Sequence, residues 1–156
     1  MSEWIRWTIP PAIMVSLVSS AHAVEYLSVE QAQKQAFPAA TRFAAVDGRA
    51  FRALAGERSL GLLVVDHVIG KHLYIDYAVA IDPGGRVQRV EILQYRESYG
   101  GEVRSASWLA QFVGKSNGSP LRIGNDITNI SGATLSSTHV TEGVKRILAA
   151  YGSRAR

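Results

Sequence analysis

The chain has 156 residues, with 17 basic and 13 acidic side chains, a formal net charge of +4 and no cysteine. The absence of cysteine excludes thiolate catalysis, cysteine-ligated iron–sulfur clusters and c-type haem attachment. Basic residues are scattered and do not form a stripe with interleaved aromatic side chains, so no nucleic acid is expected as a partner. The sequence also has neither a P-loop nor a dinucleotide-binding glycine pattern.

Residues 1–23 have the pattern of an export signal. Arg6 gives a short positive start, residues 7–18 are apolar, and an A-x-A cleavage sequence ends at Ala23. The apolar segment is short for a membrane span, and two prolines interrupt it. We therefore expect a signal peptide over 1–23 and one domain over 24–156. The alternative is an uncleaved N-terminal anchor.

The first half of the domain mixes helix and strand patterns. Ser28 is expected to begin a helix that ends before Pro38. Residues 49–55 fit a second short helix or a turn. The apolar run 60–69, with a polar interruption, indicates a strand that bends.

A β-hairpin follows. Residues 73–81 are rich in β-branched and aromatic side chains, and residues 82–85 (DPGG) are typical of a turn. Residues 86–95 then alternate, as expected of a strand with two different faces.

The C-terminal third is expected to contain two helices. Residues 104–112 fit a helix, and residues 121–123 fit a short strand. Apolar residues at helical spacing predict a final amphipathic helix: Val140, Val144, Ile147, Leu148 and Tyr151. Strands gather centrally and helices flank them, so we predict an α+β single domain with a central, largely antiparallel sheet.

Residues 131–137 (SGATLSS) hold four hydroxyl side chains immediately before the final helix. The free amides and the dipole of a helix N-terminus favour an anion such as a phosphate. The simpler interpretation is an ordinary helix whose N-cap is Ser136 or Ser137.

SGATLSS resembles the flavinylation motif of the FMN-binding domain family. That family includes the periplasmic FMN-bearing subunits of the Rnf complex and of the sodium-translocating NADH:quinone reductase. In those proteins FMN is joined through its phosphate to the last residue of S/T-G-A-T/S, which is Thr134 here. The resemblance implies covalent FMN, attached by a flavin transferase that uses FAD as donor.

Two further segments carry the resemblance. Residues 95–101 (YRESYGG) look like a variant of the family's H-x-E-T-P-G segment, with Glu97 and Ser98 in the acidic and hydroxyl places and Tyr99 in the proline place. Residues 108–115 match the pattern W-x3-F-x-G-K. The resemblance therefore covers most of residues 25–150.

The resemblance implies a set of cofactor-binding residues and no catalytic or metal-binding ones. The set is Thr134, Ser131, Gly132, Ala133, Leu135, Ser136, Glu97, Ser98, Gly100 and Trp108. Trp108, Tyr99, Tyr95 and Phe112 are candidate walls for the isoalloxazine ring, although each could equally be a core residue. Glu97 and Ser98 could contact the flavin or could be a polar strand end that turns at the following glycines.

The chain departs from the family at one position. An aspartate usually stands three residues before the motif, and that position is Thr128 here. Asp126 could replace it only if the loop is shifted. If the flavin transferase reads this aspartate, modification would be less efficient.

The function implied is that of an exported flavoprotein electron carrier with FMN on Thr134. It would be periplasmic, could associate with the membrane, and would exchange electrons with a membrane or periplasmic redox protein. The alternative is a non-catalytic periplasmic binding or assembly module without covalent flavin. Other constellations are weak: His67, His72 and His139 lack metal-ligand spacing, and no nucleophile-elbow glycines flank Ser136 or Ser137.

Overall fold

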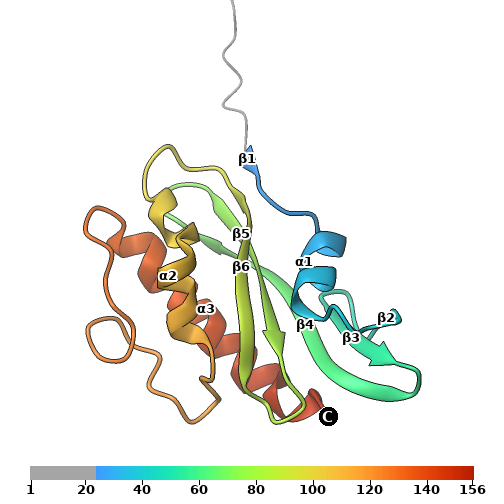
Figure 1. The fold of residues 1–156 in the computed structure, drawn as a ribbon. Coiled ribbons are helices and arrows are strands. Elements are labelled where there is room, and N and C mark those ends of the chain that lie inside the picture. The colour runs from blue at the N-terminus through green and yellow to red at the C-terminus, as the bar shows by residue number, and fades with distance from the viewer. Residues whose placement is uncertain (1–23) are drawn as a thin grey trace, which may run out of the picture.

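A computed structural model of the chain describes residues 24–156, so the predicted export signal over 1–23 lies outside the described residues. Six strands form one antiparallel sheet in the order β1-β6-β5-β4-β3-β2 (Figure 1). They are β1 (Val24–Glu25), β2 (Arg42–Ala45), β3 (Ala50–Ala55), β4 (Arg58–Ile69), β5 (Tyr74–Ile81) and β6 (Val87–Tyr95). The helices are α1 (Val29–Ala36), α2 (Ala106–Leu109) and α3 (Thr134–Tyr151), with 3-10 turns η1 (Gly101–Arg104), η2 (Ala110–Phe112) and η3 (Gly152–Arg154). The predicted α+β single domain with an antiparallel sheet is confirmed.

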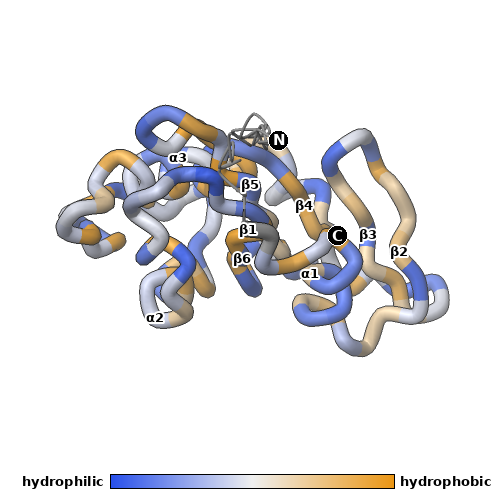
Figure 2. The backbone as a smooth tube through the Cα atoms, turned by 90° about the horizontal axis from the view of Figure 1, so that it is seen from above, coloured by the Kyte–Doolittle hydropathy of each residue, from blue (hydrophilic) through white to orange (hydrophobic). Residues whose placement is uncertain are grey.

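Helices cover both faces of the sheet. Along β5, Ile75, Tyr77, Val79 and Ile81 are buried in the cluster that includes α3, whereas Ala78 and Ala80 are buried with α1. Figure 2 shows α2 and α3 on one side of β5 and β6, and α1 on the other. Because successive strand residues point to opposite faces, one strand serves both cores.

The N-terminal part of the sheet differs from the prediction. Residues 49–55 were expected to form a helix or turn, but Ala50–Ala55 is strand β3, paired with both β2 and β4. Strand β2 was not predicted. Both segments are short and lack a clear period, so pairing decides their conformation: β2 pairs with β3, and β3 pairs with the long strand β4.

The region 104–112 was predicted as one helix, which is wrong. Only residues 106–112 are helical in sequence, as the four-residue α2 followed directly by η2, and non-helical Ser105 (φ −56°, ψ 126°) separates them from η1. The predicted strand 121–123 is reduced to a single bridge between Ile123 and Ile127.

The first and last helices follow the prediction closely. Ser28 caps α1 and forms a reciprocal capping box with Gln31. All five apolar residues predicted to line the final helix are buried in α3. Within residues 24–156, no helix has the length and apolar character needed to cross a membrane.

Candidate flavin site

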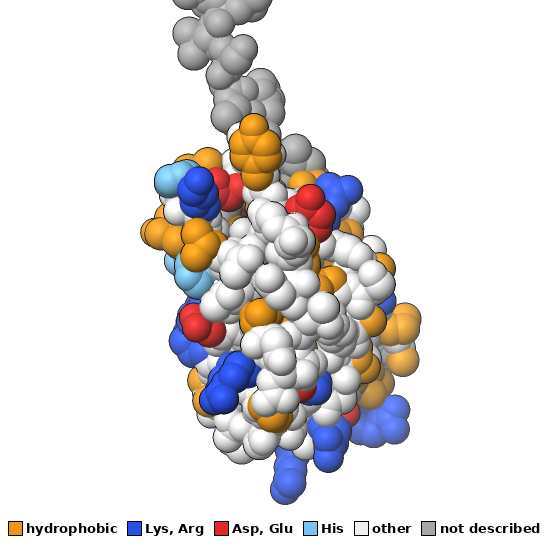
Figure 3. All heavy atoms as spheres, turned by 90° about the vertical axis from the view of Figure 1, so that its left-hand side faces the viewer, with side chains coloured by type: hydrophobic (Ala, Val, Ile, Leu, Met, Phe, Trp, Pro, Cys, Tyr) orange, Lys and Arg blue, Asp and Glu red, His pale blue; other side chains and the backbone are white. Residues whose placement is uncertain are grey.

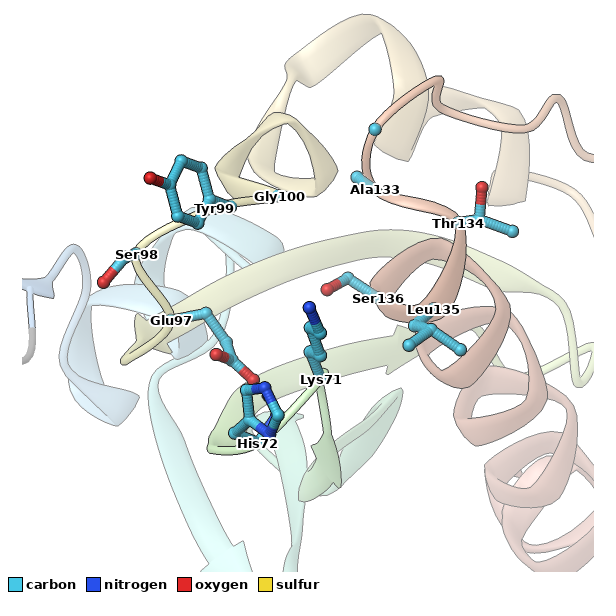
Figure 4. Close-up of a pocket in the computed structure, with 11 residues that line it drawn as sticks. Lys71, His72, Glu97, Ser98, Tyr99, Gly100, Ala133, Thr134, Leu135 and Ser136 are labelled. Carbon is cyan, nitrogen blue, oxygen red and sulfur yellow. Dashed lines mark hydrogen bonds between the residues drawn. The ribbon is translucent and has the colours of Figure 1, made fainter.

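A pocket opens at one end of the sheet, where three distant segments meet (Figure 4). These segments are the turn between β4 and β5, the loop 96–100 after β6, and the start of α3. The pocket has a volume of about 520 Å³, within the range of small-ligand sites. Its lining residues are Lys71, His72, Glu97, Ser98, Tyr99, Gly100, Gly132, Ala133, Thr134, Leu135 and Ser136.

The hydroxyl-rich loop enters α3 through Gly132, which has φ +83°, a conformation that side chains with a Cβ rarely adopt. The helix begins at Thr134 with Ala133 as N-cap, so the expected cap at Ser136 or Ser137 is wrong. Ala133 has no side-chain oxygen to accept from the first-turn amides. The N-terminus of α3 therefore lacks a side-chain cap and faces the pocket.

Thr134 and Ser136 lie on opposite sides of this first turn. Thr134 is exposed, and its Oγ1 accepts one long hydrogen bond, of 3.3 Å, from Asn129 Nδ2. Asn129 is itself held by the Ser137 hydroxyl, which donates to its Oδ1 over 3.2 Å. In Figure 4 the Thr134 hydroxyl points outward, whereas the buried Ser136 hydroxyl points inward, on the side of Lys71.

Gly100 lies in the loop after β6 and packs closely against the start of α3. It has φ +88°, and a Cβ at this position would lie 2.6 Å from Tyr95 Oη and 3.2 Å from Ser136 Oγ. The Tyr95 hydroxyl donates to the carbonyl of Tyr99 and lies 3.4 Å from Ser136 Oγ. Burial raises the pKa of Tyr95, so this phenol stays protonated and holds the two segments together.

Glu97 clamps the turn between β4 and β5 to the loop after β6. Its Oε1 accepts from the backbone amides of His72 and Leu73, the latter over 2.7 Å. Burial acts to raise the pKa of Glu97, but these amides outweigh it and lower that pKa. Glu97 therefore lines the pocket and also fixes the backbone of the neighbouring turn, and a contact with flavin stays a prediction.

Of the four aromatic residues predicted as walls for the flavin ring, one lies at the pocket and three lie in the core. Tyr99 lines the pocket and is 87% exposed. Trp108, Phe112 and Tyr95 are buried and do not line it. Trp108 packs edge-to-face on Phe112, and its Nε1 donates to the carbonyl of Thr128 over 2.8 Å, so it fixes the segment before the motif. Among the residues predicted to bind cofactor, only Ser131 and Trp108 lie outside the lining.

Exposed apolar side chains lie at the pocket and on the strand ends beside it. Among the described residues, the exposed large apolar side chains are Ile69, Leu73, Tyr74, Tyr99, Val113 and Leu135. All but Val113 belong to the three segments that form the pocket or to the adjacent strand ends. Figure 3 shows apolar side chains exposed towards this upper end of the molecule. Such a cluster is typical of a surface that covers a ligand or a partner.

The carboxylate of Asp126 binds backbone amides of its own loop and is not shifted towards the SGATLSS motif. Its carboxylate accepts from the amides of Leu121 and Arg122 and pairs with Lys115 Nζ over 3.1 Å. Burial opposes ionisation, but these partners lower the pKa of Asp126 to about 2. The exposed residue Thr128 thus stands where the family's aspartate would be, and Asp126 does not replace it.

The Asp126 contacts should make stability depend on acid. Because the folded pKa is depressed, the carboxylate stabilises the fold above its unfolded pKa, and this contribution disappears as pH falls from about 4 to about 2. Asp126→Asn should lower the free energy of unfolding by about 1–2 kcal/mol at neutral pH and flatten its pH dependence in that window. Urea unfolding across the pH range measures both, with the exposed Glu57→Gln as control. An unchanged acid slope in Asp126→Asn would contradict this account.

The sequence did not identify the positive side of the pocket. Lys71 lies in the β4–β5 turn and reaches the pocket only because this turn folds over the loop after β6. His72 was considered only as a metal ligand, and no group of three potential ligands among residues 24–156 could hold a metal ion. A basic residue in a short turn gives no local signal of a binding role.

The fold and the pocket together define a single α+β domain with a ligand site at the end of its sheet. The sequence model of the FMN-binding domain matches residues 70–149, which span all three pocket-forming segments. The chain therefore belongs to the FMN-binding domain family and is a flavin-binding module.

A comparison with solved structures finds the crystal structure of Shewanella oneidensis NqrC, with a TM-score of 0.49 and 15% sequence identity. The match covers 81% of this chain and 72% of that chain. A comparison with curated proteins gives no match.

Proposed function

We propose that the protein is an exported electron carrier whose FMN is attached through its phosphate to Thr134. The observation that carries this proposal is the position of Thr134. It is the last residue of the S-G-A-T sequence and the first residue of α3, and this exposed residue lines the edge of the pocket. The hydroxyl has one weak partner in the described chain, Asn129, and is free to react.

Attachment requires a flavin transferase and FAD as co-reactant. The Thr134 oxygen attacks the phosphorus of the FMN half, the pyrophosphate bond breaks, AMP leaves, and the hydroxyl proton passes to solvent. The product is a phosphodiester, so no oxidation or reduction accompanies the transfer. A first turn without a side-chain cap offers its amides and positive dipole end to this anion.

The remaining pocket residues suit a flavin. Leu135 and Tyr99 provide apolar surface, while Ser98, Lys71 and Glu97 provide polar groups. When bound, FMN supplies the redox chemistry, and the protein orients the ring and sets its electrostatic surroundings. Attachment keeps the flavin at the pocket at high local concentration, so tight non-covalent binding is not needed.

The mouth of the pocket supports exchange with another protein. Its exposed apolar residues would remain accessible beside the tethered ring, which favours electron transfer with a membrane or periplasmic redox partner over turnover of a soluble substrate. We further propose that residues 1–23 direct export and are removed after Ala23. The domain would then meet its transferase on the periplasmic side.

The direct test is the intact mass of the exported protein produced with and without an active flavin transferase. With the enzyme, the mass should increase by one FMN less one water, and the protein should be yellow. Without it, the apo mass is expected. A colourless wild-type protein in the presence of an active transferase would overturn the proposal.

Position 128 holds a threonine where the family usually has an aspartate. This difference favours a second candidate function, a binding or assembly module of the same fold without covalent flavin. Asp126 is held by Lys115 and by amides of its own loop, so it is not available to the transferase. If the transferase recognises an acidic group at position 128, Thr128→Asp should therefore increase the rate of attachment severalfold. The measurement is the fraction of flavinylated protein against time by mass spectrometry, with Asn125→Asp as a charge-matched control. Equal rates of attachment in wild type and Thr128→Asp would show that the transferase does not recognise an acidic side chain at this position.

A further inference from the structure

Lys71 presents a positive charge to the pocket without a counter-ion of its own. In Figure 4 its side chain rises from the β4–β5 turn, and its amino group points into the pocket towards the start of α3. Over residues 24–156, no carboxylate lies within 4.0 Å of Lys71 Nζ, so this lysine forms no ion pair there. The charge is therefore available to a ligand.

The backbone around Lys71 is fixed although its side chain is exposed. Gly70 N donates to the Leu73 carbonyl over 2.8 Å, which closes the turn, and Glu97 binds the amides of His72 and Leu73. A Cβ on Gly70 would come within 3.0 Å of Glu97 Oε1, so glycine permits this close approach. The carboxylate of Glu97 is thereby bound to the backbone and forms no direct ion pair with Lys71.

The position of Lys71 suits the flavin ring better than the phosphate. The phosphate would be bound to Thr134, whose hydroxyl lies on the outer side of the first turn, whereas Lys71 lies on the inner side with Ser136. The N-terminus of α3 already offers amides to the phosphate. Leu135, Tyr99 and Lys71 line the same pocket, so a ring held there would lie near the Lys71 amino group.

We propose that Lys71 is the cation that stabilises the reduced flavin ring in this pocket, an inference that rests on the proposed function. Uptake of two electrons and one proton by a flavin ring adds one net negative charge to it. A nearby ammonium group stabilises this charge and has little effect on the neutral oxidised ring, so it raises the midpoint potential. Lys71 thus sets the potential and is not needed for attachment.

The experiment compares flavinylated full-length wild type with Lys71→Met, Lys71→Arg and Lys34→Met. Lys34 is an exposed residue of α1 outside the pocket, so its removal changes the net charge equally. Lys71→Met should weaken the stabilisation of the reduced ring by about tenfold, which is about 30 mV for a two-electron couple. Lys71→Arg and Lys34→Met should stay near the wild-type potential. The Lys71→Met difference should shrink at high salt, because the charge is solvent-accessible.

Mass spectrometry of the same samples separates the possible failures. Equal flavin content and equal potentials in all variants would overturn the role of Lys71 while leaving the proposed function intact. Lower flavin content in Lys71→Met, with an unchanged potential, would place Lys71 at the phosphate and also overturn the inference. Wild-type protein without flavin would overturn the proposed function, and this inference with it.

Discussion

Thr134→Ala should leave the exported protein without covalent flavin, even beside an active flavin transferase. The variant lacks the oxygen that would form the phosphodiester, and alanine is compatible with the first turn of a helix. The expected result is the apo mass, no yellow colour and unchanged thermal unfolding. Intact mass and the visible absorption spectrum measure it.

Two hydroxyl variants make this prediction specific. Thr134→Ser should retain the mass increase, because serine places a hydroxyl at the same position. Ser136→Ala is the matched loss of a hydroxyl two residues along the same turn, where the side chain is buried and faces inward. It should still be modified. Flavin on Thr134→Ala would move the attachment to another hydroxyl of the loop and contradict the assignment.

Asp66→Ala should cause a large loss of stability. Asp66 lies on β4 and is 8% exposed. Its Oδ1 accepts from Arg49 Nη1 over 3.1 Å and its Oδ2 from Arg146 Nη2 over 3.0 Å, so one carboxylate links the sheet to α3. Burial opposes its ionisation, but the two arginines lower its pKa below the usual value. Removing the carboxylate should cost about 3 kcal/mol of unfolding free energy, because two adjacent cations lose their shared partner.

Asp76→Ala is the matched control for Asp66→Ala. Asp76 lies on the neighbouring strand β5 and pairs with Arg96 over 2.7 Å, but its side chain is 30% exposed. A pair that retains access to water contributes less, so we expect a loss of about 1 kcal/mol or less. Urea unfolding of both variants at neutral pH gives the comparison. Equal losses would mean that burial and the second arginine add nothing at Asp66.

Local sequence signals were sufficient where an element is long and its pattern is complete. The hairpin of β5 and β6, the capped helix α1 and the amphipathic helix α3 all follow from their own residues. They failed at β2, β3 and the broken helical segment 101–112. There the conformation depends on pairing with neighbouring strands, or on burial of Trp108 and Phe112 in the core, and neither is specified by the local residue pattern.

Local sequence signals likewise pointed to some residues of the candidate site and missed others. A contiguous motif pointed to Thr134 and its neighbours as candidates, since the proposed attachment needs a particular residue in a particular local order. The segment 95–101 was identified by its order too, and the structure places Glu97, Ser98 and Gly100 at the same pocket as Thr134. Trp108 also belongs to a matching pattern, but it supports the loop from the core and does not line the pocket.

The sequence by itself determined the α+β class, the antiparallel hairpin, the final helix and the family to which the chain belongs, because each is encoded in neighbouring residues. Only the tertiary structure decided that Lys71 and Thr134 line one pocket, that Asp126 is paired with Lys115, and that Glu97 binds the β4–β5 turn. These contacts join segments more than ten residues apart, and their geometry depends on how the sheet and α3 pack. The charge around the pocket is therefore a property of the folded domain, whereas the motif that contains the proposed attachment residue is a property of the sequence.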